Sequence, residues 1–68
     1  MHPMRRSKAL AEIGYDEPTR TLRVRFRNGG LYDYLDVDPE IVIGLLESAH
    51  PWTEWQEQVI AHEYRRLE

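Results

Sequence analysis

Three arginines and two tyrosines, set around a pair of glycines, are the residues most suited to contact a ligand. The segment from Arg23 to Tyr34 reads Arg-Val-Arg-Phe-Arg-Asn-Gly-Gly-Leu-Tyr-Asp-Tyr. Guanidinium groups bind phosphate, and tyrosine rings provide faces on which nucleobases stack. These residue types indicate an RNA-binding surface, with its phosphate contacts at Arg23, Arg25 and Arg27 and with added positive charge from Arg5, Arg6 and Lys8.

Regular alternation on both sides of Gly29 and Gly30 predicts a β-hairpin. Its register matters because a shift of one residue turns every side chain of a strand to the opposite face. A loop of residues 28–29 would put Arg25 opposite Tyr32. The arginines and tyrosines would then share the exposed face.

A longer loop, residues 28–30, instead pairs Phe26 with Tyr32 and directs the tyrosine rings into the core. Arg25 then faces Asp33 on the exposed side. We favour this register because the first one puts Asp33 on the apolar face, where an unpaired carboxylate costs several kcal/mol.

The elements around the hairpin predict an α+β domain in the order β-β-β-α-α. A three-stranded antiparallel meander is expected, followed by two helices packed on one sheet face. The expected strands cover residues 9–15, 21–27 and 31–37. One domain, residues 1–68, is expected, with residues 1–6 as a flexible tail.

Two helices are predicted from their start signals and apolar spacing. Asp38 is a capping residue and Pro39 suits the first helical position, so a helix should run from there to about Ser48. Its buried face is expected to comprise Val42, Leu45, Leu46 and Ala49. Thr53 and Gln56 match a capping box, which predicts a second helix over about residues 54–65.

The charge is divided unevenly between the two halves of the chain. Residues 1–30 contain seven Lys/Arg and three acids, a net charge of +4, whereas residues 31–68 contain two and nine, a net charge of −7. The first half could attract a polyanion through a local patch. Equally, the two halves could neutralise each other across the fold.

Several classes of protein are disfavoured by the composition. The chain has no cysteine and no apolar run long enough for a membrane helix, so we expect a cytoplasmic protein without membrane contact. The three histidines have no metal-binding spacing, and no serine or threonine has an indicated base. We therefore expect no enzymatic activity, cofactor, metal or small-molecule substrate.

Two tryptophans in so short a chain have two interpretations. Trp52 and Trp55 can provide bulk for a thin core, which we favour, or can anchor a partner. If Trp52 is exposed beside Ile43, these residues would form an apolar patch typical of protein interfaces. A protein-interaction or homodimerisation module is therefore the alternative to RNA binding.

An ordered set of short motifs resembles the KTSC domain family. It comprises Ser7-x-Ala9-Leu10, Ile13-Gly-Tyr-Asp16, Leu22-x-Val24-x-Phe26, Gly29-Gly30, Tyr32-Asp-Tyr34 and Val37-x-Pro39. The family occurs at the carboxy terminus of some lysyl-tRNA synthetases and as short bacterial proteins, and the synthetase context implies RNA binding. Tyr64 also fits the family pattern, whereas Glu57 and Ala61 replace an asparagine and an arginine.

Overall fold

The predicted meander forms the centre of a larger sheet in the computed structural model, which describes residues 1–68. The strands are His2–Pro3 (β1), Leu10–Asp16 (β2), Thr21–Phe26 (β3), Leu31–Tyr34 (β4) and Tyr64–Arg66 (β5). The helices are Pro39–Glu47 (α1) and Pro51–Ile60 (α2). The predicted α+β class is confirmed, but the sheet has five strands because a short strand is added at each edge.

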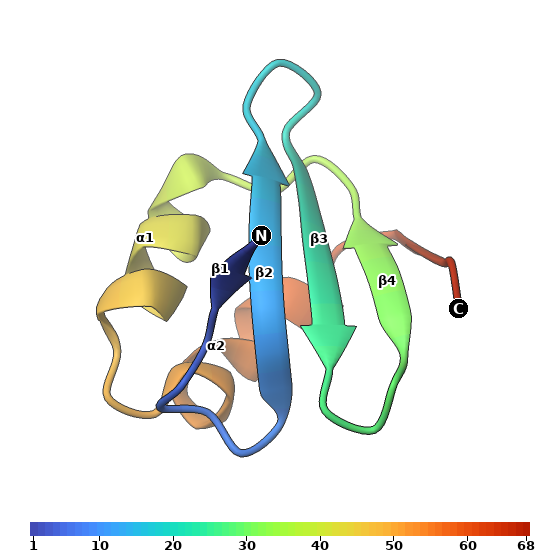
Figure 1. Cartoon of the computed structure of the whole chain (residues 1–68). Helices are drawn as coiled ribbons and strands as arrows, with labels where there is room; N and C mark the ends of the chain where they lie inside the picture. The colour runs from blue at the N-terminus through green and yellow to red at the C-terminus, as the bar shows by residue number, and fades with distance from the viewer.

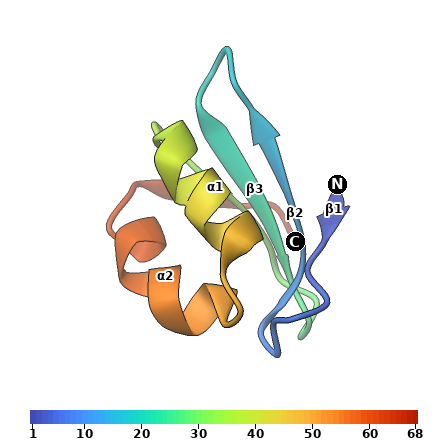
Figure 2. The same ribbon diagram turned by 90° about the vertical axis from the view of Figure 1, so that its left-hand side faces the viewer.

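All neighbouring strands pair antiparallel, in the spatial order β1-β2-β3-β4-β5 (Figure 1). Both helices cover the same face of the sheet (Figure 2). The core lies between these two layers and comprises Met4, Leu10, Ile13, Leu22, Val24, Tyr34, Val37, Val42, Leu45 and Val59. The opposite face, which we call the outer face, is left without a covering layer.

The loop between β3 and β4 begins one residue earlier than predicted. Phe26 donates its backbone N–H to the carbonyl of Gly30 at 2.8 Å, so the loop consists of residues 27–29. Gly29 has a φ of 101°. A three-residue hairpin loop needs such a left-handed residue at its third position, and glycine adopts this conformation without strain.

This loop shifts the strand pairing by two residues from the predicted register. Arg23 lies opposite Asp33, where the prediction placed Arg25. A shift of two residues nevertheless leaves every side chain on its predicted face. The tyrosines point toward the helices as predicted, and Tyr34 is buried while Tyr32 is half-buried.

The first residues of the chain, predicted to be a flexible tail, are placed in the sheet. His2 pairs with Ile13 as part of β1, and the Met4 side chain is buried in the core. Burial of this methionine removes apolar surface from water and fixes the segment to the rest of the fold.

Helix α1 begins at the predicted position but not with the predicted cap. Asp38 precedes the helix and makes no side-chain capping bond. Its carboxylate is instead hydrogen-bonded and ion-paired to Arg20. Pro39 occupies the start of the helix, where its missing N–H has no consequence.

The buried face of α1 is narrower than the sequence predicts. Val42 and Leu45 are buried as expected. Leu46 is 41% exposed and Ala49 is also exposed, so their predicted burial is wrong.

Neither helix has the length and apolar character needed to cross a membrane.

Helix α2 starts earlier and ends earlier than predicted. It begins at Pro51, which takes the first helical position, so Thr53 and Gln56 lie inside the helix and form no capping box. It ends at Ile60, and the following residues turn back to form β5 along β4. The predicted continuation of this helix to Arg65 is therefore wrong.

Candidate functional site

Arg23 and Arg25 of β3, which the sequence analysis predicts to contact RNA together with Arg27 of the following loop, lie on the outer face. There Arg23 binds Asp33 through two parallel bonds, from Nε to Oδ1 at 2.8 Å and from Nη2 to Oδ2 at 3.0 Å. These bonds lower the pKa of the Asp33 carboxyl below its ordinary value, although burial of the group opposes the shift. Arg65, across the strand pair, adds to the lowering.

Arg25 of β3 and Arg27 of the loop also form hydrogen bonds within the protein. Arg25 donates from Nη2 to the Glu68 carboxylate at 2.9 Å and from Nη1 to the carbonyl of Gly29 at 3.2 Å. Arg27 donates from Nε to the carbonyl of Ser7 at 2.8 Å and from Nη2 to that of Met4 at 2.9 Å. Only Arg27 among the three is left without a carboxylate partner.

Every ion pair in the structure joins the basic first half of the chain to the acidic second half. The pairs are Arg20 with Asp36, Arg20 with Asp38, Arg23 with Asp33, and Arg25 with Glu68. Much of the positive charge on β3 is therefore neutralised within the protein.

A second group of cations remains free of carboxylates at one end of the sheet. Arg5, Arg6 and Lys8 are exposed and take part in none of the ion pairs. The guanidinium of Arg27 bridges the carbonyls at both ends of the Met4–Ser7 segment and so brings a fourth cation to this segment. We call these four residues the basic patch.

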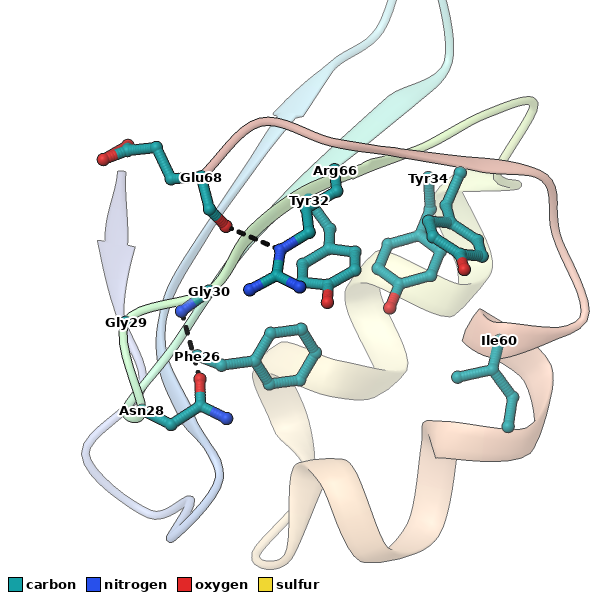
Figure 3. Close-up of a pocket in the computed structure, with 10 residues that line it drawn as sticks. Phe26, Asn28, Gly29, Gly30, Tyr32, Tyr34, Ile60, Arg66 and Glu68 are labelled. Atoms are coloured by element: carbon teal, nitrogen blue, oxygen red, sulfur yellow. Dashed lines mark hydrogen bonds between the residues drawn. The ribbon is translucent and has the colours of Figure 1, made fainter.

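A cleft lies between the helix-facing side of the β4–β5 strand pair and α2 (Figure 3). Its volume is about 670 Å³. The hairpin loop borders it through Asn28, Gly29 and Gly30, and the carboxy-terminal segment borders it through Arg66 and Glu68. We call it the tyrosine cleft because Tyr32, Tyr34 and Tyr64 line it together with Phe26 and Ile60.

The three tyrosine rings form one cluster. The Tyr32 and Tyr34 rings lie nearly parallel, 16° apart, with centroids separated by 6.2 Å. The Tyr64 ring is tilted toward both, at 5.6 Å from Tyr32 and 6.0 Å from Tyr34. In Figure 3 the hydroxyls of Tyr32 and Tyr34 point into the space bounded by Phe26 and Ile60. The cluster thus presents aromatic surface with polar edges.

These hydroxyls are available to a ligand. Tyr15 donates its hydroxyl to the Val37 carbonyl, whereas Tyr32, Tyr34 and Tyr64 have no protein partner for theirs. Burial raises the pKa of Tyr34 above its ordinary value, and the neighbouring phenols add to the shift. At neutral pH Tyr34 is therefore a hydrogen-bonding phenol and not a base.

A cation lies at the rim of the tyrosine cleft. The Arg66 guanidinium carbon is 5.6 Å from the Tyr32 ring centroid, within the range of a cation–π contact. Its Nε donates to the Glu68 backbone carbonyl at 3.0 Å (Figure 3). The side-chain carboxylate of Glu68 is bonded to Arg25, and Arg66 forms no ion pair with a side-chain carboxylate.

The tryptophans act mainly in packing. The Trp52 ring meets Phe26 edge-on at 5.2 Å between centroids, and the Trp55 ring covers Gly44 of α1. Both are half-buried against the core, in agreement with the favoured interpretation. Ile43 is exposed on α1.

The family model of the KTSC domain matches residues 6–64, nearly the whole chain. The chain belongs to the KTSC domain family. The match includes Arg6, Lys8 and Arg27 of the basic patch, the hairpin and the first residue of β5. No curated protein is a significant match to the chain.

The sequence interpretation did not find two residues of the tyrosine cleft in this KTSC domain. Tyr64 and Arg66 were placed in or after a helix, but β5 sets them opposite Tyr34 and Tyr32. The local sequence Tyr-Arg-Arg-Leu does not alternate between apolar and polar residues, so it has no strand signal of its own.

Proposed function

We propose that this KTSC domain is a small non-enzymatic module that binds RNA through the basic patch. The observation that carries the proposal is a difference among the cations of residues 1–30. Arg23 and Arg25 are held by carboxylates, whereas Arg5, Arg6, Lys8 and Arg27 have none. Exposed cations without carboxylate partners attract phosphate groups, and this attraction weakens as the salt concentration rises.

This assignment changes which residues of the sequence prediction carry the function. Arg27 and the amino-terminal cations Arg5, Arg6 and Lys8 stay in the proposed RNA contact. Arg23 and Arg25 are instead assigned to ion pairs within the protein. An overall charge of −3 would repel RNA from most of the surface, so binding depends on this local patch. The exposed acidic residues on α1 and α2, such as Glu40, Glu47, Glu54 and Glu57, disfavour RNA contact with the surfaces of the helices that carry them.

Fluorescence anisotropy with labelled tRNA and a random single-stranded RNA, measured over a range of salt concentrations, tests the proposal. The triple variant Arg5→Gln/Arg6→Gln/Lys8→Gln should bind more weakly. Its plot of log affinity against log salt should also be less steep by about 2, since each lost single-strand phosphate contact removes about 0.7.

Arg65→Gln is the matched control, because Arg65 is also exposed and belongs to none of the ion pairs but lies on the outer face. This control should retain the wild-type affinity within about twofold. Absence of binding at low salt, or equal weakening by the patch variant and the control on a per-charge basis, would contradict the proposal.

A further inference from the structure

We infer that the tyrosine cleft is a subsite for one unstacked nucleobase of the RNA strand whose phosphates lie on the basic patch. This inference rests on the proposed function, RNA binding, and names a nucleobase as the group that the cleft holds.

Tyr64 is the aromatic side chain that is free to receive a base. It is 58% exposed, whereas every other aromatic side chain of the chain is buried or half-buried. Its backbone pairs with Tyr34 in the sheet, so the ring has a defined position although most of its surface faces solvent. Exposed rings held on strands are the usual platform for single-stranded bases.

The polar groups around this platform match the edge of a base. Three tyrosine hydroxyls without protein partners line the cleft. The Asn28 Oδ1 accepts from the Gly30 N–H at 3.0 Å, which leaves the amide NH₂ of Asn28 free. Arg66 contributes donors, and its planar guanidinium can also stack on a base. Together these groups can donate to carbonyl and ring-nitrogen acceptors.

The ring spacing restricts how the base can lie. A base inserted between two rings needs two stacking separations of about 3.4 Å each. The centroids of Tyr32 and Tyr34 are only 6.2 Å apart, so no base fits between them. The base must therefore stack on the exposed side of Tyr64 and direct its polar edge toward the hydroxyls.

The hairpin loop connects the cleft with the basic patch. Arg27 belongs to the patch, and the next three residues of the loop, Asn28, Gly29 and Gly30, line the cleft. A strand that follows the hairpin loop from a phosphate contact at Arg27 runs past these residues toward the cleft.

Short single-stranded RNA and an oligonucleotide of equal length with abasic positions at its centre distinguish base contacts from phosphate contacts. Wild-type protein should bind the abasic oligonucleotide roughly tenfold more weakly, as expected for loss of one stacked base. Tyr64→Leu should remove this difference and leave the salt dependence unchanged. Leu67→Ala, also at an exposed apolar residue but outside the cleft, should retain the difference.

Failure of this inference can be distinguished from failure of the proposed function. Salt-dependent binding with equal affinity for both oligonucleotides, or a preference that persists in Tyr64→Leu, would overturn the base subsite alone. Loss of binding to both at low salt would overturn RNA binding itself.

A titration with uridine monophosphate and adenosine monophosphate, monitored through the NMR signals of the tyrosine rings, tests binding to the cleft independently of an RNA strand on the basic patch. Shifts at Tyr32 and Tyr64 in the wild type, with the Tyr32 shift lost in Tyr64→Leu, would support the subsite. No shift at millimolar nucleotide would overturn it.

Discussion

The guanidinium of Arg23 and the carboxylate of Asp33 lie opposite each other on β3 and β4 and form a two-point ion pair. Asp33 is only 5% exposed, so this pair satisfies a carboxylate that the sheet almost removes from water. A bidentate arginine is the partner best suited to such a group. The pair therefore assigns Arg23 to the stability of the sheet, and the proposed RNA contact involves other cations.

Asp33→Asn should lower the stability of the protein measurably, because Arg23 loses its partner and the buried amide cannot replace both bonds. The urea midpoint, followed by tryptophan fluorescence, measures this change. Asp36→Asn is the matched control, because the Asp36 carboxylate also faces an arginine, with Arg20 Nε at 3.6 Å, but is 89% exposed. That control should change stability by less than about 0.5 kcal/mol, and an equal loss in both variants would contradict the assignment.

The same ion pair predicts an acid-sensitive component of stability. The pKa of the Asp33 carboxyl is lowered in the folded protein, so its ionised form stabilises the fold. This stabilisation is fully present above the ordinary carboxyl pKa of about 4 and is lost as the pH falls below that value. The stability difference between wild type and Asp33→Asn should therefore decrease between about pH 4 and pH 2. A difference that stays constant over this range would show that Asp33 is not the titrating group.

Gly44→Ala should destabilise the protein although alanine is the better helix former by about 1 kcal/mol. A methyl group at position 44 would overlap the six-membered part of the Trp55 ring, which packs directly on this glycine. The ring would have to move and expose apolar surface. Thermal unfolding measures the effect, and the double variant Gly44→Ala/Trp55→Leu should be more stable than Trp55→Leu alone. A stabilised single variant would contradict the observed packing.

Two neighbouring leucines of α1 should respond very differently to truncation. Leu45 is 1% exposed and Leu46 is 41% exposed. Leu45→Ala should cost about 2–5 kcal/mol, comparable to the whole stability expected of a domain this small. Leu46→Ala should cost less than about 1 kcal/mol. Equal losses in chemical denaturation would restore the broader buried face that the helical spacing predicts.

The sequence is sufficient for the central features of the fold because they depend on local signals. Alternation and the glycine pair identify the hairpin and the faces of its side chains, and Asp38-Pro39 locates the start of α1. The exact register is not determined locally, since two adjacent glycines allow two positions for the left-handed residue. Gly29 takes that role, and this choice decides that Arg23, not Arg25, meets Asp33.

The remaining features depend on contacts distant in sequence. The Asp38 carboxylate binds Arg20 and therefore does not cap helix α1. Strand β5 forms because the backbone groups at the edge of β4 are free to pair with it. Neither partner is visible from the residues nearby. The tyrosine cleft could not be predicted for the same reason, because Tyr64 joins Tyr32 and Tyr34 only through β5.

Two-dimensional amide NMR of ¹⁵N-labelled protein at low salt maps an RNA contact directly. If RNA binds through the basic patch and the tyrosine cleft, added single-stranded RNA should shift the amides of residues 5–8 and 27–30 most strongly, together with those of residues 64–66, and moderate salt should reverse these shifts. Shifts centred on Arg23 and Asp33 of the outer face or on Trp52, or no shifts at all, would contradict binding through the basic patch.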